Sequence, residues 1–381
     1  LFQRGVLNAQ LMEIIRANVR DPVVAEGDLY SLAACNDAGS VRLRQTLQEF
    51  GQGDVTQLGE HIVEVSRRAM EAAIQELPEG QYHHSTVIDG YDQPLTLRCG
   101  LTVTQSSINI DFAGSPAASA YGINVPLPYT QAYASFGVRC IVGGEIPNNA
   151  GSLAPIRVQA AEGSLLAALP PSAVSARHAV GQMLPDLVLG CVAQFLPEAV
   201  PAEGASCIWN PVLRGPDFVI NPIFNGGTGA RPGKDGLSTT AFPSGVRTTS
   251  TEINEVTAPL VFWQREYAVD SAGRGRLRGG LGQTLEIAHR HDQAFTISKM
   301  FDRLQHPAAG RDGGESGAPG VVALLQDGDA RLLAGKGVDQ VPAGARLRLQ
   351  TPGGGGIGPI EQRSASLHAA DVAAGLVSDG P

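Results

Sequence analysis

The sequence lacks the signals of membrane and nucleic-acid-binding proteins. No apolar run approaches the roughly 18 residues that a membrane span needs, and no signal-peptide pattern opens the chain. The formal net charge is −9, and no run of like charge exceeds the arginine-rich segment 270–280, so the basic patch of a nucleic-acid binder is missing. We therefore expect a cytoplasmic protein that binds no membrane and no nucleic acid, and whose partners are proteins or small molecules.

Cysteine is sparse, and its spacing excludes the common cysteine-based sites. The five cysteines are odd in number, widely separated and never arranged as C-x-x-C. This pattern favours reduced thiols in a cytosolic protein over disulfides or a zinc knot. We expect all five to fill the core: Cys35, Cys99, Cys140, Cys191 and Cys207.

Familiar catalytic motifs are also missing. There is no G-x-S-x-G elbow, no H-E-x-x-H spacing and no cysteine-nucleophile motif. His289 and His291 would share a strand face and could bind one ion, but no third ligand lies near them in sequence. His178 lies in an apolar helix with Asp186 eight residues further on. Each histidine is expected to be a satisfied core residue, and the catalytic residues stay unknown.

Glycine, in contrast, is abundant, with 47 residues, and it clusters with charged residues at 224–236 (FNGGTGARPGKDG). Successive glycine N–H groups can form an anion-holding nest, to which Arg231 or Lys234 could add positive charge. The segment is not a nucleotide P-loop, because Lys234 is followed by Asp235 rather than by Ser or Thr. One interpretation is a substrate or anion contact, and the other is a tight turn whose Arg and Asp pair with each other. The candidate contacts are Asn225, Thr228, Arg231, Lys234 and Asp235.

A second glycine cluster, 270–282 (DSAGRGRLRGGLG), places arginines at alternate positions. On an extended segment Arg274, Arg276 and Arg278 would project to one side. They could clamp a phosphate or carboxylate, with Arg274 and Arg276 as anion or interface contacts. The favoured alternative is a set of structural salt bridges. The partners would be carboxylates such as Glu252, Glu255 or Glu266.

The apolar patterning predicts an α+β protein in three regions: a helical segment at 1–78, a mixed α/β region at 79–216 and a glycine-rich, mostly β region at 217–381. In the first region, one helix should end at 21–22, and a second should begin at 27–28. A third should end at Gly51, and an amphipathic helix should span 55–77.

The other two regions carry strand signals. Residues 95–105 and 106–115 have the alternation of paired strands, whereas the apolar helix at 173–195 should be kinked or divided at Pro185. Hairpin-like strands follow, with Asp327-Gly328 as a turn signal. They lie in segments 283–302, 320–335 and 345–356.

Both ends of the sequence look cut. The first residues carry no initiator Met and begin inside a helical apolar pattern, and the last residues stop without a closing element. We expect the sequence to be part of something longer.

Six motifs in one order make the chain resemble the hydantoinase B/oxoprolinase family. They are 18–20 (NVR) with 27–28 (GD) and 33–35 (AAC), 110–126 (IDFAGSPAASAYGINVP), 145–158 (EIPNNAGSLAPIRV), 226–236 (GGTGARPGKDG), 270–282 and 351–358 (TPGGGGIG). Together they cover nearly the whole chain. The family includes B subunits of N-methylhydantoinase, the matching part of 5-oxoprolinase, and subunits of acetone and acetophenone carboxylases. The second motif adds Asp111 and Asn124 to the candidate substrate contacts.

The resemblance implies a B-type subunit of an ATP-dependent hydrolase that opens a hydantoin, oxoproline or lactam ring. An ATP-binding A-type subunit would use ATP, giving a hetero-oligomer, and the B-type part would complete hydrolysis of a phosphorylated intermediate. The family also implies a divalent metal ion, Zn or Mn, at the hydrolytic site. The family's His and Asp ligands lie upstream of the first motif, so no metal ligand is assigned to this chain and the site would be completed outside it.

Two alternatives stay open. The chain could be a subunit of an ATP-dependent ketone carboxylase, which would need bicarbonate and a ketone. It could also be a non-catalytic scaffold subunit, in which case the arginine and glycine segments would serve only the fold.

Overall fold

The computed structural model describes residues 1–19, 21–51 and 53–378. The chain forms two compact units, Leu1–Val65 and Ser66–Pro381. Helices combined with several small open sheets confirm the α+β class. The division into three regions at 78/79 and 216/217 stays a prediction. Arg20, the last residue of the first sequence motif, lies outside the described residues.

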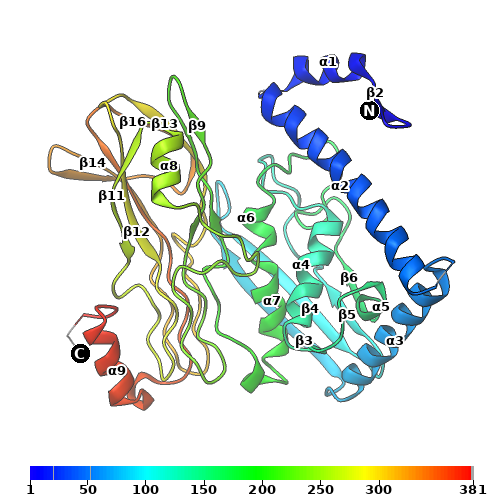
Figure 1. The fold of residues 1–381 in the computed structure, drawn as a ribbon. Coiled ribbons are helices and arrows are strands. Elements are labelled where there is room, and N and C mark those ends of the chain that lie inside the picture. The colour runs from blue at the N-terminus through cyan, green and yellow to red at the C-terminus, as the bar shows by residue number, and fades with distance from the viewer. Residues whose placement is uncertain (20, 52, 379–381) are drawn as a thin grey trace. The chain divides into compact units, whose positions relative to one another are not determined.

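The first unit is mainly helical (Figure 1). A short antiparallel pair, β1 (Phe2–Gln3) and β2 (Val6–Leu7), precedes α1 (Ala9–Asn18). The Asn8 side chain caps α1 by accepting a hydrogen bond from Leu11 N at 3.1 Å. The end of α1 agrees with the predicted helix stop before 21–22.

The predicted helix break at 27–28 is wrong, because α2 (Pro22–Glu49) runs through Gly27 and Gly39 without interruption. A glycine inside a helix costs only about 1 kcal/mol relative to alanine. The stronger signal is at the start, where the Asp21 side chain accepts from Val24 N at 3.1 Å and Pro22 occupies the first turn.

The long helix predicted at 55–77 is confirmed as α3 (Thr56–Gln75). Its last three turns belong to the second unit, where Met70 and Ile74 are fully buried in the main core. The helix stops three residues before Pro78, as the sequence indicates.

A four-stranded sheet and the helices packed on it form one part of the second unit. The order is β3-β4-β5-β6, with β5 and β6 parallel and the other neighbours antiparallel. The predicted strand pair at 95–115 is confirmed by β4 and β5. The bounds are β3 (Gly80–Ile88), β4 (Leu95–Val103), β5 (Ile108–Asp111) and β6 (Ile156–Gln159).

Helices α4 and α7 pack against each other beside this sheet (Figure 1). The predicted division of the apolar helix is confirmed: Pro185 is the second residue of α7, and α6 ends at Gly181. A proline in the first helical turn loses no hydrogen bond, so it starts a helix well. The helices are α4 (Leu127–Arg139), α5 (Ala150–Leu153), α6 (His178–Gly181) and α7 (Leu184–Val192), followed by the 3₁₀ turn Pro197–Ala199.

Two antiparallel sheets form the other part of the second unit. One has the order β11-β12-β17-β14-β15, and the other has the order β16-β13-β8-β9. The strands are β8 (Val212–Arg214), β9 (Val219–Ile220), β11 (Leu260–Tyr267), β12 (Gln283–His289), β13 (Phe295–Met300), β14 (Val321–Gln326), β15 (Asp329–Leu332), β16 (Lys336–Val341) and β17 (Arg346–Gln350). Short β7 (Ile208–Trp209) pairs with β10 (Phe224–Asn225), and the remaining elements are α8 (Thr251–Thr257), the 3₁₀ turn Ile360–Gln362 and α9 (Ala365–Ala373).

The hairpin predictions for this part are confirmed in one case and wrong in another. The Asp327-Gly328 turn joins β14 to β15, and both of its residues have positive φ. β12 and β13 are strands as predicted, but they belong to different sheets and do not pair with each other. The alternation that identifies a strand does not identify its neighbour.

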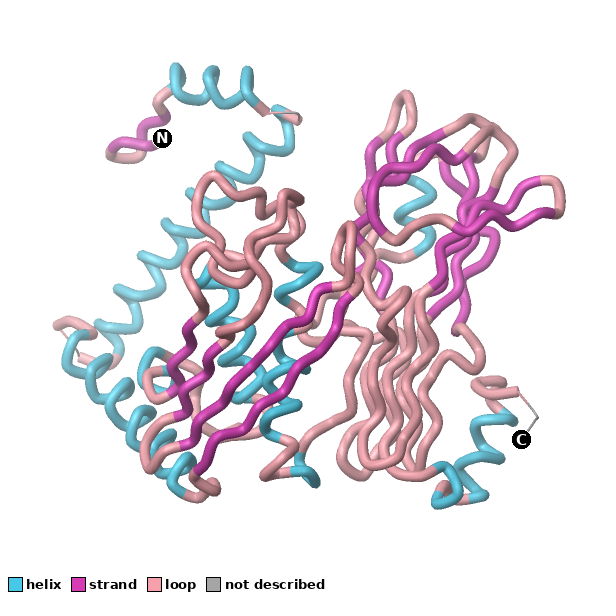
Figure 2. The backbone as a smooth tube through the Cα atoms, turned by 180° about the vertical axis from the view of Figure 1, so that it is seen from behind, coloured by secondary structure: helices cyan, strands magenta, loops and turns pink. Residues whose placement is uncertain are grey.

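The glycine-rich sequences form extended segments that lie side by side outside the sheets, and we call them the glycine bundle (Figure 2). It consists of residues 202–206, 226–230, 271–282, 308–318 and 351–358. Gly354 N donates to Gly280 O at 2.9 Å, and Gly280 N donates to Thr228 O at 2.8 Å. A Cβ on Gly354 would collide with the Thr228 carbonyl, and one on Gly227 with that of Gly280. Glycine is therefore needed here for close backbone approach.

The core prediction for cysteine is right for three residues and wrong for two. Cys99, Cys191 and Cys207 are buried in the second unit, whereas Cys35 and Cys140 are exposed. Cys35 lies on α2, which buries no residue at all. None of the described helices is both long and apolar enough to cross a membrane.

Candidate functional site

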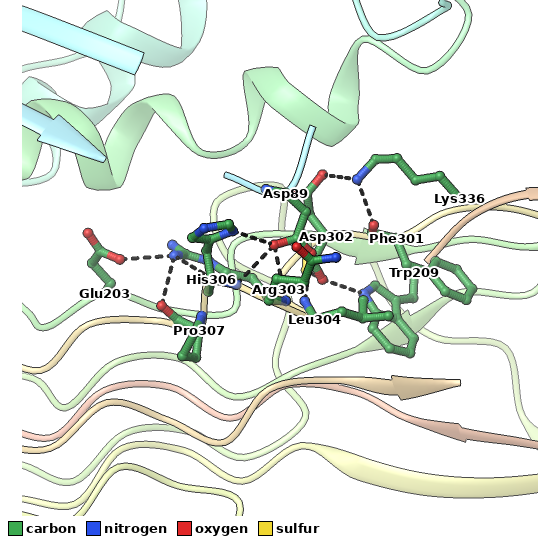
Figure 3. A network of polar contacts seen from close by, with 12 residues as sticks. Asp89, Glu203, Trp209, Phe301, Asp302, Arg303, Leu304, His306, Pro307 and Lys336 are labelled. Atoms are coloured by element: carbon green, nitrogen blue, oxygen red, sulfur yellow. Dashed lines mark hydrogen bonds and ion pairs between the residues drawn. The ribbon is translucent and has the colours of Figure 1, made fainter. Parts of the chain in front are cut away.

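A cluster of buried charged residues surrounds residues 301–307, the loop that follows β13 (Figure 3). Asp302 and Arg303 are only 1% and 2% exposed. Their side chains have different partners: Asp302 contacts Lys336, and Arg303 contacts Glu203. Charged groups are buried at this level only when they are paired, so the partners define the cluster.

The Arg303 guanidinium lies between two buried carboxylates. Its Nη1 is 3.0 Å from Glu203 Oε2, and its Nη2 is 3.7 Å from Asp186 Oδ2. Asp186 comes from the first turn of α7, and Glu203 comes from the glycine bundle. The network therefore joins α7, the glycine bundle and the loop after β13. Glu203 and Ala309, which also contact each other, are separated by 106 residues.

Asp186 is fully enclosed, and its contacts are mostly neutral. Its Oδ2 accepts hydrogen bonds from Gly204 N at 3.1 Å and from the Ser206 hydroxyl. Burial, together with the negative charge of Glu203, raises the pKa of Asp186 to about 6, although Arg303 opposes this shift. This carboxyl can therefore hold a proton at slightly acid pH.

Glu203 is the ionised partner. Burial alone would raise its pKa, but the charge of Arg303 and a hydrogen bond from Ala309 N at 3.1 Å outweigh burial and lower the pKa below its ordinary value. Two carboxyls whose surroundings separate their pKa values are a common basis of acid–base chemistry. The same contacts also tie the glycine bundle to α7.

His84 connects this network to a surface cavity. Its ring packs so closely on α7 that a Cβ on Gly190 would overlap it. Burial lowers the pKa of His84, while the charge of Glu203 partly restores it, so the ring is neutral at pH 7. The ring borders a cavity of about 380 Å³. The other lining residues are His83, Ser85, Arg98, Cys99, Gly100 and Ala113.

A second set of contacts anchors the same loop to the end of β3. Asp89 accepts hydrogen bonds from Leu304 N at 2.7 Å and from His306 N and Nδ1, both at 3.0 Å. These bonds lower the pKa of Asp89, although its burial acts in the opposite direction. On the other side, Lys336 Nζ lies 2.7 Å from Asp302 Oδ2. These contacts fix the loop that presents Arg303.

The described residues do not fit the metal ion that the family implies. Among residues 1–19, 21–51 and 53–378, no group of three or more His, Cys, Asp or Glu side chains could hold one. Asp186 and Glu203 are occupied by Arg303 and backbone N–H groups. We therefore derive no step through a metal ion.

Three of the predicted contacts at 224–236 have structural partners. The Thr228 hydroxyl accepts from Leu237 N at 2.8 Å. Arg231 donates to the carbonyl oxygen of Asp235 through Nε at 3.0 Å and Nη2 at 2.8 Å, whereas the Asp235 carboxylate binds Arg363 at 2.9 Å. The turn is thus closed by its own arginine, but through a backbone oxygen. Substrate contact by these residues stays a prediction.

The other two predicted contacts in this segment differ in exposure. Lys234 is exposed at the tip of the turn. Asn225 is 4% exposed, and its Oδ1 has no hydrogen-bond partner among the described residues. The N–H groups of the glycines do not form an open nest: Gly227 N, for example, donates to Pro352 O at 3.0 Å.

The alternating arginines do not project to one side as predicted. Arg274 and Arg276 are exposed, whereas Arg278 is buried and lies 3.1 Å from Asp371. The favoured salt-bridge alternative holds for two of them, but with other carboxylates, because Arg274 pairs with Glu315 at 2.8 Å. The predicted Glu252, Glu255 and Glu266 are not the partners that the structure shows.

Asp111 and Asn124 both stabilise local turns. Asp111 accepts from Ala113 N at 2.9 Å and from Gln159 Nε2 at 3.0 Å. Asn124 is fully buried, and its Nδ2 donates to three carbonyl oxygens at 2.9 Å each. Their role as substrate contacts stays a prediction.

Sequence reasoning missed Glu203 and Arg303 and named Asp186 only as a neighbour of His178. His178 instead pairs with Asn210 Oδ1 at 2.9 Å. The one usable signal was Asp186 itself, an acidic residue inside an otherwise apolar helix. A carboxylate in such a place requires a buried partner, although the sequence does not say which.

Solved structures with a similar fold indicate the class of protein to which this chain is related. The chain aligns with the crystal structure of the ATP-dependent caprolactamase from Pseudomonas jessenii with a TM-score of 0.86 and 20% identity, over 99% of this chain and 69% of that one. A nucleotide-free acetone carboxylase structure aligns with a TM-score of 0.72 and 17% identity, over 82% of this chain and 50% of that one. These likenesses show the fold.

The family model for hydantoinase B/oxoprolinase matches residues 1–360, and the chain belongs to that family. The chain is 27% identical over 391 aligned positions to a protein named as a D-/L-hydantoinase B subunit in Pseudomonas sp. (strain NS671). That alignment covers 95% of this chain and 64% of the relative, so the chain spans a little under two thirds of that protein's length. The resemblance drawn from the six motifs is thereby confirmed.

Proposed function

We propose that this protein is a cytoplasmic B-type subunit of an ATP-dependent cyclic-amide hydrolase. The observation that carries the proposal is the family match over residues 1–360. It is supported by the names of two relatives, a hydantoinase B subunit and an ATP-dependent caprolactamase, both of which refer to cyclic amides. The reaction is the opening of a hydantoin, oxoproline or lactam ring, and an A-type subunit uses the ATP.

The chemical logic is that an amide resists hydrolysis until its oxygen is phosphorylated. Phosphorylation of the enol oxygen makes the carbon more electrophilic and supplies a better leaving group. The B-type part then completes the attack by water on that carbon: the C–N bond breaks and the released ring nitrogen takes up a proton. The acyl phosphate that remains is hydrolysed by a second water to a carboxylate and inorganic phosphate. A divalent metal, Zn or Mn, held outside the described residues belongs to the same proposal, but no step here is routed through it.

Within this chain, we assign the proton handling to His84 and the network behind it. His84 borders the 380 Å³ cavity and is neutral at pH 7, so it can accept a proton there. Glu203 favours the charged form of His84, and Arg303 holds Glu203 in place. Glu203, Arg303 and Asp186 are positioning residues, because burial keeps them from direct contact with a substrate.

The test is reconstitution of the full-length protein with an A-type subunit, ATP, and a panel of a hydantoin, 5-oxoproline and a lactam. Ring opening should require both subunits and should release phosphate in step with the opened product. His84→Gln should lower kcat with little change in KM and should flatten the lower limb of the pH profile. Ring opening by this chain without any partner, or an unchanged pH profile for the variant, would overturn the proposal.

A second candidate is a subunit of an ATP-dependent ketone carboxylase, favoured by the TM-score of 0.72 with acetone carboxylase. The same reconstituted complex decides between the two. Labelled bicarbonate appearing in the product, with a ketone as substrate, would select the carboxylase. If neither reaction occurs and the Arg231 and Arg274 variants change nothing in the complex, the chain is a scaffold subunit.

A further inference from the structure

A separate pocket lies where β11 and β12 meet the segment 237–249, and each residue that lines it carries a polar or charged group. Its volume is about 430 Å³, within the range of small-molecule sites. It is distinct from the His84 cavity, with which it shares no lining residue. The lining residues are Thr239, Thr248, Arg265, Glu266, Tyr267 and Gln283.

Arg265 is the residue in this pocket that indicates a ligand-binding site. Its half-buried guanidinium donates to three neutral oxygens: Thr248 Oγ1 at 2.9 Å, and Thr249 O and Thr251 Oγ1, both at 3.1 Å. Within the described chain no carboxylate forms an ion pair with it at 4 Å or less. Burial lowers the pKa of Arg265, and the exposed Glu252 only partly offsets this effect.

Other arginines of the same sheet show the contrast. Arg346 and Arg348 on β17 both pair with the carboxylate of Glu286 on β12. Those two charges are compensated by the chain itself. A half-buried cation that faces a cavity without an ion-paired carboxylate is a poor arrangement for stability alone, since burial of an unpaired charge is costly.

The wall behind the pocket contains a second under-satisfied group. Asn225 is 4% exposed, and its Nδ2 reaches Val246 O only at 3.5 Å while its Oδ1 has no partner in the described chain. It lies directly behind the lining, because its backbone oxygen accepts from Gln283 Nε2 at 2.9 Å. A buried amide with so little hydrogen bonding is uncommon in a region that serves only packing.

We propose that this pocket binds a small molecule through an oxyanion, either a carboxylate or a phosphate group. Arg265 supplies the charge, and the Thr239 and Tyr267 hydroxyl groups supply further donors, while Thr248 holds the guanidinium in place. The Glu266 carboxylate at the rim contacts Gln264 and disfavours a second negative charge, so a monoanion fits best. The inference stands on this pocket alone and does not rest on the proposed hydrolase function.

Isothermal titration of the full-length protein with inorganic phosphate and, separately, with acetate tests the proposal. We expect a dissociation constant of about 1 mM for at least one of them, and its preference tells which oxyanion the pocket takes. Arg265→Gln should weaken binding by roughly 10- to 100-fold, because a hydrogen bond to a charged group contributes about 1.5–3 kcal/mol. Arg265→Lys keeps the charge and should weaken binding less.

Arg346→Gln is the matched control, because it removes an arginine from the same sheet that already has a carboxylate partner. It should leave anion binding unchanged, and circular dichroism should show every variant folded. If Arg265→Gln fails to fold, Arg265→Lys and Thr248→Val carry the test, both with weaker binding expected. Failure of folded wild-type protein to bind either anion, or equal binding by the Arg265 and Arg346 variants, would overturn the inference.

Discussion

The carboxylate of Asp186 lies 3.7 Å from the guanidinium of Arg303. At this distance the two opposite charges attract each other, but the distance is too long for a good hydrogen bond. Arg303 makes its short contact with Glu203 instead, at 3.0 Å. One buried cation is thus shared unequally by two buried acids. Burial and the charge of Glu203 raise the pKa of Asp186, whereas the close contact with Arg303 outweighs burial and helps to lower the pKa of Glu203.

Asp186→Asn should stabilise the fold relative to wild type as the pH rises. Because the pKa of Asp186 is raised from 3.8 to about 6 in the folded protein, the stability that it contributes is full below about pH 4 and is lost as the pH rises through 6. The variant has no such loss, so its advantage should grow by an amount on the order of 2 kcal/mol between pH 4 and 7.5. Urea unfolding at a series of pH values measures it.

Glu203→Gln should show the opposite slope. A carboxyl with a lowered folded pKa contributes stability above its unfolded pKa and loses it as the pH falls through the folded pKa. The free energy of unfolding that wild type gains over this variant should therefore be largest at neutral pH and should shrink as the pH falls below about 4.5. If both variants changed with pH in the same direction, the assignment of protonated and ionised partners would be wrong.

Arg303→Met should destabilise the protein strongly, because it leaves Glu203 and Asp186 buried without their cation. Breaking a buried pair in this way typically costs about 3–5 kcal/mol. Arg274→Met is the control: its pair with Glu315 is about half exposed, and such pairs contribute about 0–1 kcal/mol. Urea midpoints at one pH compare the two. Equal, small losses would mean that the network does not hold the glycine bundle to α7.

Gly354→Ala should disrupt the glycine bundle, because the new Cβ would collide with the Thr228 carbonyl. Overpacking of this kind costs about 1–3 kcal/mol, and more where backbone atoms cannot move. Gly144→Ala is the matched control, since no atom lies within 4 Å of a Cβ there and the position is exposed. Thermal unfolding should separate the two variants by several degrees. A silent Gly354→Ala would show that the bundle tolerates side chains.

Local pattern predicted most of the single elements. The apolar spacing of α3, the β-branched alternation of β4 and β5, and the Asp327-Gly328 turn each depend on residues close in sequence. The failed helix break at Gly27 shows the limit of local signals, because the cost of one glycine is smaller than the gain from continuing a helix. The pairing of β12 and β13 failed for a different reason: sheet neighbours are chosen by tertiary packing.

The buried network could not be predicted, because its members meet only in the folded chain. Glu203 and Ala309 are 106 residues apart, and Asp89 and His306 are 217 apart. The glycine bundle was interpreted as an anion-holding nest or a tight turn for a related reason. The sequence does not distinguish a glycine that is needed for close approach to another backbone from a glycine that is needed for a turn. The charged residues between such glycines were therefore interpreted as anion contacts. Arg231, however, closes a turn by donating to the Asp235 carbonyl oxygen.

Lys234 and Arg231 give the sharpest test of the predicted anion contact. Lys234 is exposed, whereas Arg231 closes its own turn on the Asp235 carbonyl. If the turn contacts the phosphorylated intermediate, Lys234→Gln should raise the KM of the complete complex by roughly tenfold, equivalent to one charged hydrogen bond, without lowering the unfolding temperature. Arg231→Gln should lower the unfolding temperature as well, because it opens the turn. Steady-state kinetics and thermal unfolding of the same preparations separate the two effects. Unchanged kinetics in Lys234→Gln would make the segment a structural turn.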